Sequence, residues 1–422
     1  MLSSGMRKES PALAAAACAG GACAVGQVLL IREALTLWSG FELAAGLVLA
    51  SWLLFAGLGG AVGARMVGTT RRARAALAWG LPAMALALPA GMLAMRAAPE
   101  VAGLGPGELP GLTILLATAM LAPAPSAGAA GLLFAAAWAA TGSAAQAKPL
   151  RIYMLEALGA TAGGLALAFV LLPNLGSLRS CLAASVVLLG PAAWCALCLD
   201  RGRGRAVGAC LAAALLLAAG LAGSAGLDRA SRAWQWGKRL VEVRDTPYQN
   251  LALLENHGQL SLFANGLWSF SLPDEKSAQQ DAHLPLLMHA DPRSVLVLEG
   301  DPFGLPQEVL AHPGVDRVDV VLQDPGVLGI VPARPPQDPR LELRLRDPAA
   351  YVREAGRRYD VVILAAGDPL SMGSNRLYSL EFFRDMKKRL AEGGVLGLSV
   401  SGPALSPGPA QLARLRSILA TL

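Results

Sequence analysis

The stretch YDVVILAAGDPLSMGSNRLY, residues 359–378, decides how the C-terminal half of the chain folds. Its apolar run, 361–364, has no polar interruption, which is typical of a parallel strand buried on both faces of a sheet. Ligand-binding side chains usually follow the carboxyl ends of such strands. Here the strand is followed by Ala365 and Ala366, so no reactive side chain stands where one is expected.

The same stretch is the fourth in a series of short apolar runs. Strands are predicted at 294–298, 317–322, 341–346, 360–364 and 394–400, with helical stretches between them. This alternation is typical of a doubly wound, mostly parallel α/β sheet, that is, a Rossmann-like fold. Residues 241–290 instead contain alternating polar and apolar residues around two turns, Asn256-His257-Gly258 and Asn265-Gly266, which predicts a small antiparallel β subdomain.

Acidic residues gather at the strand ends of the predicted parallel sheet. Gly300 and Asp301 follow the first strand, Asp324 follows the second, Asp347 the third, and Asp368 comes shortly after the fourth. Since ligands bind beyond the carboxyl ends of parallel strands, these residues suit a cationic or hydroxyl-rich ligand. Asp and Gly at strand ends also act as helix caps and turn formers, and the spacing alone leaves both interpretations open.

The chain as a whole is too apolar for a soluble protein. It has 422 residues, of which 54% are hydrophobic, and its mean hydropathy is +0.47. Residues 1–228 hold 14 Lys and Arg against 8 Asp and Glu, whereas residues 229–422 hold 22 of each. The net charge of +6 therefore lies in the hydrophobic half, where Lys and Arg set membrane topology. We expect the lipid bilayer as a partner and no nucleic acid.

Seven apolar segments are long enough to cross a bilayer as helices. They lie near 10–32, 42–66, 75–96, 110–141, 152–173, 178–199 and 206–227. The fourth contains Pro123 and Pro125 and is either one kinked helix or a span with a re-entrant half. Basic residues gather at the N-terminus and after the second, fourth and sixth segments. The positive-inside rule thus predicts a multi-pass protein of the inner or plasma membrane, with a cytoplasmic N-terminus and an extracytoplasmic soluble domain.

Polar features of the membrane half allow more than one interpretation. Residues 229–240 mix basic and aromatic side chains, which suits a connector at the membrane interface or an ordinary linker helix. The ionisable residues near the spans are chiefly Arg32-Glu33, Glu42 and Glu156. They indicate either a proton or substrate path or water-facing span ends. All six cysteines lie in apolar runs, where packing is their expected role, and no metal site is predicted.

Several motifs follow one another in a characteristic order. In the C-terminal half they are YQNLAL, NGLWSFSLPDE, HLPLLMH, VLVLEGDPFG, DPRLELRLRD and YDVVILAAGDPLSMGSNRLYSLEFF. In the membrane half they are QVLLIREALTLWSGFELAAGLVLASWLL and IYMLEALGATAGGLALAFVLLPNLG. Together they resemble the spermidine synthase (polyamine aminopropyltransferase) family, in its bacterial branch fused to transmembrane helices. The resemblance implies a Rossmann-like, methyltransferase-type domain.

That family transfers an aminopropyl group from decarboxylated S-adenosylmethionine to an amine, a step in polyamine biosynthesis. The resemblance implies that Gln249, Asp301 and Asp347 face the nucleoside donor, and the strand-end residues Gly300 and Asp324 are predicted to bind it with them. It also implies that Asp368 and Tyr378 shape a pocket for a polyamine or another small cation, and these two are the candidate catalytic residues. The chemistry requires a base, normally a carboxylate, that deprotonates the attacking amine.

The chain departs from the family's pattern at central positions. The catalytic Asp corresponds to Ala365, and the Glu that binds the ribose corresponds to Leu322, which cannot accept hydrogen bonds. The glycine-rich loop reads LEGDPFG, in which Glu299 replaces one glycine and Pro302 removes an N–H donor. We therefore expect a membrane-bound protein with diminished or altered aminopropyl transfer, or a pseudoenzyme.

Other classes of function stay open. The protein is alternatively a non-catalytic module that binds small molecules, or a scaffold or transport-associated protein in a membrane complex or homo-oligomer. Asp301, Asp347 and Asp368 favour ligand binding, whereas Ala365 favours lost chemistry. One helix follows the last predicted strand, where the family fold has further strands, so residues 291–422 are expected to form a domain truncated at its C-terminus.

Overall fold

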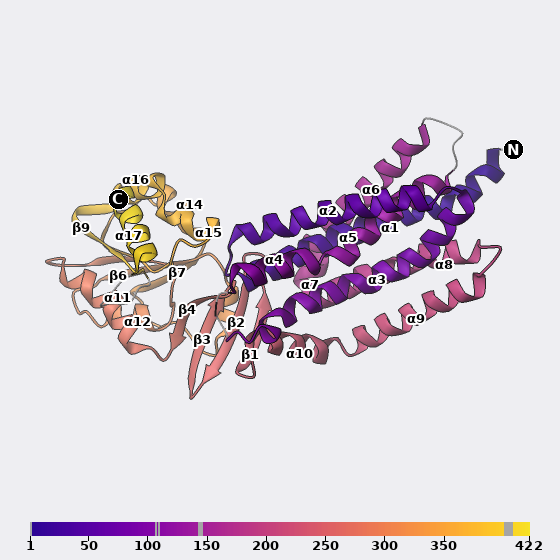
Figure 1. The fold of residues 1–422 in the computed structure, drawn as a ribbon. Helices are drawn as coiled ribbons and strands as arrows, with labels where there is room; N and C mark the ends of the chain where they lie inside the picture. The colour runs from indigo at the N-terminus through magenta and orange to yellow at the C-terminus, as the bar shows by residue number, and fades with distance from the viewer. Residues whose placement is uncertain (1, 106–107, 109, 142–146, 401–407) are drawn as a thin grey trace. The chain divides into compact units, whose positions relative to one another are not determined.

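The computed structural model describes residues 2–105, 108, 110–141, 147–400 and 408–422. Within them the chain forms two compact units (Figure 1). A helical unit comprises the residues up to Trp38 together with Glu42–Lys238, and an α/β unit comprises Ser39–Phe41 together with Arg239–Leu422. The change in composition after residue 228 thus lies close to the boundary between the units.

The helical unit consists of long apolar helices. In the described part of the chain, six are long and apolar enough to cross a membrane: Ser10–Leu37, Glu42–Met66, Thr70–Val101, Leu112–Ala140, Leu150–Leu197 and Arg203–Ala222. The elements are α1 (Leu2–Leu37), α2 (Glu42–Met66), α3 (Thr70–Val101), α4 (Leu112–Leu121), α5 (Ala124–Ala140), α6 (Ala147–Ala166), a π-helical turn (Leu167–Leu171), α7 (Leu172–Val187), α8 (Leu189–Leu197), α9 (Arg203–Ala222) and α10 (Ser224–Trp236).

The segment Leu150–Leu197 is not one straight helix. It has 48 residues, and at 1.5 Å per residue a straight helix would be about 72 Å long, more than twice the thickness of the hydrocarbon core. Gly176 interrupts it with φ 72° and ψ −179°, which is not a helical conformation. The segment therefore divides into two arms at Gly176.

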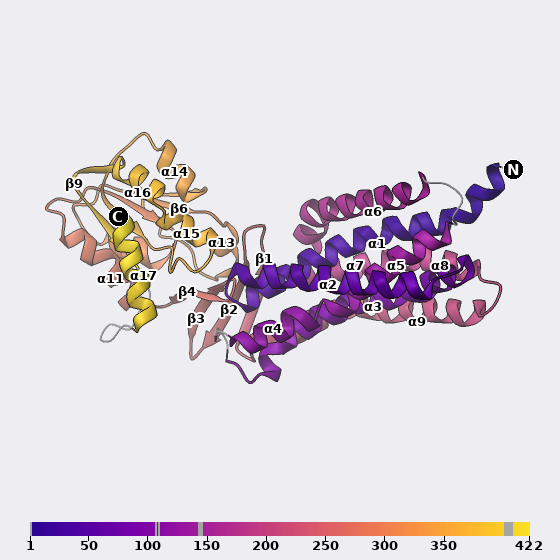
Figure 2. The same ribbon diagram turned by 45° about the horizontal axis from the view of Figure 1, so that its top comes forward.

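Contacts within the helical unit show that the two arms run in opposite directions. After the break, Arg179 donates from Nε to the hydroxyl of Ser224, at the start of α10. Cys195 lies at the other end of the bundle, with its sulfur 3.8 Å from the carbonyl oxygen of Pro11 in α1. The segments predicted as separate spans at 152–173 and 178–199 therefore lie in the two arms of one candidate span, on either side of Gly176 (Figures 1 and 2).

The fourth predicted segment is one kinked passage. Its first part, α4, ends at Leu121, and α5 begins at Ala124. Pro123 stands between them, where it supplies no N–H group to continue the helical ladder. The two parts together form one candidate span, Leu112–Ala140, so the kinked alternative describes this segment.

One end of the bundle holds a buried ion cluster. Arg96 on α3 is 1% exposed and donates to Glu33 of α1 and to Asp228 of α10, each at 2.8 Å. It also donates to the hydroxyl of Ser231 at 2.8 Å, and Arg232 lies 3.8 Å from the other oxygen of Glu33. The cluster fastens α10 to α1 and α3. Glu33, predicted beside a span end, is therefore buried and paired within the bundle.

The α/β unit begins with an antiparallel sheet. Its strands are β1 (Leu240–Asp245), β2 (Asn250–Asn256), β3 (Gln259–Ala264) and β4 (Leu267–Leu272), in the order β1-β2-β3-β4. Two turns join the last three strands, and His257 and Asn265 adopt positive φ angles there, each followed by a glycine with positive φ. The two predicted turns, at His257-Gly258 and Asn265-Gly266, thus set the pairing of β2 with β3 and of β3 with β4, as predicted.

The second sheet is parallel and has the order β7-β6-β5-β8-β9. The remaining elements are α11 (Glu275–Leu287), β5 (Ser294–Leu298), α12 (Gly304–Leu310), β6 (Arg317–Leu322), α13 (Gly326–Ile330), β7 (Leu341–Leu345), α14 (Pro348–Glu354), β8 (Tyr359–Leu364), α15 (Met372–Asn375), a 3₁₀ turn (Arg376–Tyr378), α16 (Leu380–Lys387), β9 (Leu390–Leu398) and α17 (Pro409–Thr421). The doubly wound fold is confirmed. The order reverses between β5 and β8, which makes this the switch point of the sheet.

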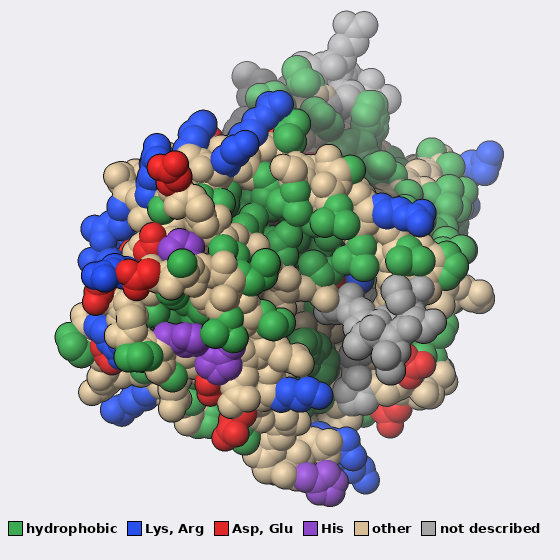
Figure 3. Space-filling view, turned by 90° about the vertical axis from the view of Figure 1, so that its left-hand side faces the viewer, with side chains coloured by type: hydrophobic (Ala, Val, Ile, Leu, Met, Phe, Trp, Pro, Cys, Tyr) green, Lys and Arg blue, Asp and Glu red, His purple; other side chains and the backbone are tan. Residues whose placement is uncertain are grey.

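Helices cover both faces of the parallel sheet. Apolar residues of α14, α16 and α17 pack on one face, and those of α11 and α12 pack on the other (Figure 1). This explains why the strands read as continuous apolar runs. On the face shown in Figure 3, basic and acidic side chains lie among hydrophobic ones.

The ion cluster predicts a stability effect in the helical unit. Arg96→Ala removes the guanidinium that lies 2.8 Å from buried Glu33 and leaves Arg232 at 3.8 Å, and breaking a buried ion pair typically costs about 3–5 kcal/mol. We expect a clearly lower Tm for the full chain in detergent micelles. Arg71→Ala, which removes an exposed arginine near the start of α3, is the matched control and should change the Tm little. A loss no larger than that of the control would contradict the role of the cluster.

Candidate functional site

The loop between β5 and α12 lies directly on the end of β8. Glu299 and Gly300 both adopt positive φ angles, 60° and 83°. A Cβ atom on Gly300 would lie 2.5 Å from the Cβ of Ala365, so only glycine fits there. A positive φ is costly for a residue such as Glu299, and outliers of this kind concentrate at functional sites. The loop that follows β5 thus packs against the end of β8, the other strand at the switch point.

Three of the predicted acidic residues accept hydrogen bonds from backbone N–H groups at the starts of helices, and one of them, Asp347, is an N-cap. Asp301 accepts hydrogen bonds from the backbone N–H groups of Phe303 and Gly304, at 2.8 and 2.9 Å. Asp324 is 3% exposed and accepts from the backbone of Gly326 at 2.8 Å. Asp347 is the N-cap of α14. The capping interpretation left open by the sequence therefore accounts for these carboxylates in the described structure.

Gln249 lies close to this edge through its backbone. Its N–H group donates to the hydroxyl of Thr246 at 3.0 Å, and its carbonyl oxygen accepts from the backbone N–H of Thr246 at 2.9 Å, in the turn between β1 and β2. The same hydroxyl donates to Asp324 at 2.7 Å. The structure thus brings the Gln249 turn to the end of β6, where the contact with Asp324 is made by Thr246.

A second group of side chains lies beyond the ends of β6 and β7. Arg376 forms an ion pair with Asp347 and donates to the side-chain oxygen of Gln323 at 2.8 Å. Burial would raise the pKa of the Asp347 carboxyl, but Arg376 and the capping N–H groups outweigh it and hold the pKa below its usual value. Asp347 therefore carries a negative charge at neutral pH.

Glu299 completes this group from the β5 side. Its Oε1 accepts a hydrogen bond from the backbone N–H of Gln323 at 3.0 Å, so its carboxyl group reaches across to the end of β6. Burial raises the pKa of Glu299 to about 7, with Asp324 and Asp347 adding to the rise and Arg376 opposing it. A carboxyl group of this kind can accept hydroxyl hydrogen bonds and can exchange a proton near neutral pH.

Leu322 itself does not face this edge. It is 1% exposed and packs in the core between the sheet and helices α11 and α12. Position 322 itself has no carboxylate, but the Glu299 carboxylate, from the loop after the neighbouring strand β5, lies at the same end of β6. The glutamate at position 299 is visible in the sequence, because it stands in a glycine-rich loop. The direction of its side chain is not visible there, since it depends on the positive φ angle of Glu299.

The opposite side of the switch point holds Asp368 and Tyr378. Asp368 forms an ion pair with Arg414 of α17 at 2.9 Å. Tyr378 is buried and donates its hydroxyl hydrogen to the carbonyl oxygen of Gly367. Burial raises the pKa of Tyr378 to about 12, with the charge of Asp368 adding to the rise. The tyrosine therefore stays a neutral donor at physiological pH.

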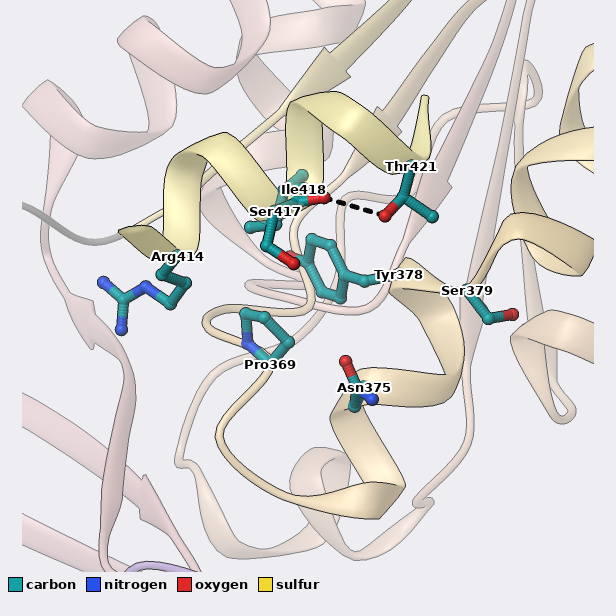
Figure 4. Close-up of a pocket in the computed structure, with 8 residues that line it drawn as sticks. All are labelled: Pro369, Asn375, Tyr378, Ser379, Arg414, Ser417, Ile418 and Thr421. Atoms are coloured by element: carbon teal, nitrogen blue, oxygen red, sulfur yellow. Dashed lines mark hydrogen bonds between the residues drawn. The ribbon is translucent and has the colours of Figure 1, made fainter. Parts of the chain in front are cut away.

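A cavity of about 380 Å³ lies beside Tyr378, between α17 and the segment 369–379 (Figure 4). The site as a whole is a row along the carboxyl edge: Glu299 and Asp347 on the β6 side, Ala365 at the centre, and Asp368 with Tyr378 on the β8 side. Among the described residues, no group of three His, Cys, Asp or Glu side chains could hold a metal ion. The arginines of this row were not foreseen from the sequence.

Comparisons with known proteins identify the C-terminal part of the chain. Residues 278–406 match the family model of the spermine/spermidine synthase domain. The polyamine aminopropyltransferase of Moorella thermoacetica is 31% identical over 166 residues, which are 37% of this chain and 58% of that protein. That of Thermoanaerobacter sp. is 31% identical over 175 residues, 39% of this chain and 62% of that protein. The chain thus spans about three-fifths of the length of these curated relatives.

Two solved structures are similar as well. A spermidine synthase in complex with the transition state analogue AdoDATO has 25% sequence identity and a TM-score of 0.38, over 44% of this chain and 65% of that chain. The spermidine synthase of Thermotoga maritima has 22% identity and a TM-score of 0.35, over 44% and 64%.

The raised pKa of Glu299 predicts a pH-dependent effect on stability. Because its pKa rises from 4.5 to about 7 on folding, the stability linked to this group is present below about pH 4.5 and is lost as the pH rises through 7. Glu299→Gln keeps an acceptor for Gln323 without the charge. We expect the variant to match the parent chain at pH 5 and to be more stable at pH 8, on the order of 1–3 kcal/mol.

Thermal unfolding of the full chain in detergent micelles measures this effect. Glu381→Gln, in the exposed first turn of α16, is the control and should show no pH-dependent difference. Equal stability of the Glu299 variant and the parent chain at pH 8 would refute the burial of this charge.

Proposed function

We propose, from the premise that the C-terminal part of this chain is a spermidine synthase-type domain, that it binds an adenosyl nucleoside and an amine along the carboxyl edge of its parallel sheet. We further propose that aminopropyl transfer there is slow or altered. The proposal rests on the row of side chains along the carboxyl edge of the sheet. Carboxylates remain on both sides of the switch point, at Glu299 and Asp368, while the central position is Ala365.

The donor side favours a nucleoside with free hydroxyl groups. Glu299 follows β5 and Asp347 follows β7, the two strands on either side of β6, and both residues interact with the Gln323–Arg376 pair. Carboxylates at such strand ends commonly accept hydrogen bonds from ribose hydroxyls. In decarboxylated S-adenosylmethionine, the family's donor, the reacting methylene carbon is bonded to a sulfonium. Binding of the ribose by Glu299 would orient that carbon toward Ala365.

The transfer step explains why the activity should be low. The amine nitrogen forms a bond to the methylene carbon, the carbon–sulfur bond breaks, and the bonding pair leaves with the sulfur as a neutral thioether. The amine must first lose a proton to a base. The methyl group of Ala365 cannot accept one, and general base help is typically worth about 10²–10⁴-fold in rate. Water is left as the acceptor at this position, which supports slow rather than absent transfer.

A non-catalytic binding module is the second candidate. It is favoured by the backbone hydrogen bonds that Asp301, Asp324 and Asp347 accept at the starts of helices, which give these carboxylates a structural role without chemistry. The two candidates differ in turnover, since both bind a nucleoside and only the first forms an aminopropylated amine.

Binding of methylthioadenosine, the nucleoside product of the family reaction, tests the proposal. We expect calorimetry on the full chain to detect binding weaker than about 1 µM at pH 8. Glu299→Gln should weaken it by about tenfold, because a charged acceptor is lost, while Glu381→Gln leaves it unchanged. Absence of binding would refute the proposed function. Rapid transfer to putrescine by the unmodified chain would refute its slow or altered chemistry.

The location of the α/β unit is proposed from the loop charges alone. We propose that residues 1–228 form a seven-span domain of the inner or plasma membrane, that 229–240 form an interfacial connector, and that the β subdomain (241–290) and the α/β domain (291–422) lie outside the cytoplasm. An extracytoplasmic location is expected to limit access to cytosolic adenosyl donors, in line with altered chemistry.

A reporter fusion after Asp245 tests this topology. A reporter that is active only outside the cytoplasm should be active at this site, because seven passes from a cytoplasmic N-terminus end on the opposite side. A reporter that is active only in the cytoplasm should be silent. The reverse pattern would overturn the orientation and leave the fold unaffected.

A further inference from the structure

The ion pair between Asp368 and Arg414 is well shielded. The side chains are 11% and 21% exposed, and the joining nitrogen and oxygen are 2.9 Å apart. Ion pairs on an exposed surface are weak because water competes for both charges, and shielding of this degree reduces that competition. The charges of both groups also act on Tyr378, whose pKa Asp368 raises and Arg414 lowers. The three side chains therefore form one electrostatic group.

The helix that carries Arg414 is held by few apolar contacts. Among the described side chains of α17, only Ile418 is buried, and it packs with the core cluster that includes Tyr378 and Phe382. Leu412 and Leu419 are exposed. A segment with so little buried apolar surface can be displaced at low cost in free energy.

The cavity beside this pair is polar. Figure 4 shows α17 along one side, with Ser417 and Thr421 facing the segment of Pro369, Asn375 and Tyr378. Thr421 donates its hydroxyl to the carbonyl oxygen of Ser417 at 2.8 Å. The lining contains one charged residue, Arg414, and no carboxylate. In the absence of a ligand, the guanidinium of Arg414 neutralises the negative charge of Asp368.

We propose that Arg414 determines which amines the site admits, because its guanidinium holds the cation position of Asp368 and an ammonium group of a ligand binds there only by displacing it. This inference rests on the proposed function, since it assigns the cation position to the amine ligand. Competition from within the same chain acts at a high effective concentration and lowers the apparent affinity for every ammonium ligand. A neutral ligand of the same length does not compete for Asp368.

Arg414→Gln is the direct test, with putrescine as the probe and the full chain in detergent micelles. We expect the variant to bind putrescine about tenfold more tightly or better than the parent chain. Arg416→Gln, which removes an exposed arginine of the same helix, is the matched control and should leave the affinity unchanged. 1,4-Butanediol, a neutral analogue of similar length, should show no gain.

A second substitution shows whether the gain depends on Asp368. In Asp368→Asn with Arg414→Gln, the gain should vanish, because the ammonium group has no carboxylate to meet. Equal putrescine affinity of Arg414→Gln and the parent chain would overturn the inference, and so would a gain that persists without Asp368. Methylthioadenosine binding, measured on the same samples, reports separately on the proposed function.

Hydrogen exchange on the unmodified chain gives a test that does not depend on how the variants fold. Saturating putrescine should increase amide exchange in residues 409–421, since Arg414 and its helix are released. Unchanged or reduced exchange in this segment at saturation would show that the amine binds without displacing Arg414.

Discussion

The contact between Gly300 and Ala365 is the constraint on which the site depends. Adjacent parallel strands lie about 4.8 Å apart, so the loop that leaves β5 must pass over the end of β8 with no space for a side chain on Gly300. The tight turn forces positive φ angles at two consecutive residues, and one of them is Glu299. That conformation directs the glutamate toward β6, where it accepts the N–H group of Gln323. One backbone restriction thereby excludes a side chain at position 300 and directs the carboxylate beside it.

The strand-end acids illustrate how closely folding and binding overlap at such an edge. Asp301 accepts backbone N–H groups at the start of α12, and Asp347 is the N-cap of α14. These bonds orient both carboxylates and favour their charged form, which is also the form that a hydroxyl-bearing ligand requires, although burial still raises the pKa of Asp301. Glu299 differs, because no helix uses it and its buried charge destabilises the fold. A group that the fold tolerates at a cost is a stronger indicator of function than one the fold needs.

The helical unit uses charge in the opposite way. Arg96, Glu33 and Asp228 come from three helices that are far apart in the sequence, and they meet at one end of the bundle. Arg96 and Glu33 would each be expensive to bury alone, and with the half-exposed Asp228 they fasten α10 to the bundle. The sequence places Glu33 beside a span end and gives no sign of its partners, since nothing local relates residue 33 to residue 96 or 228.

Local signals in the sequence determined the elements of this protein: apolar runs without polar interruption gave the parallel strands, Asn-Gly and His-Gly set the tight turns, and the length of the apolar segments indicated the membrane-spanning helices. These features can be predicted from the sequence because each depends on residues that are close together in the chain. Side-chain direction and pairing are not of this kind. Only the tertiary structure decided three features of the site: Leu322 points into the core, Glu299 reaches the neighbouring strand, and Arg414 pairs with Asp368. Each of these contacts joins segments that are far apart in the sequence and come together only when the chain folds.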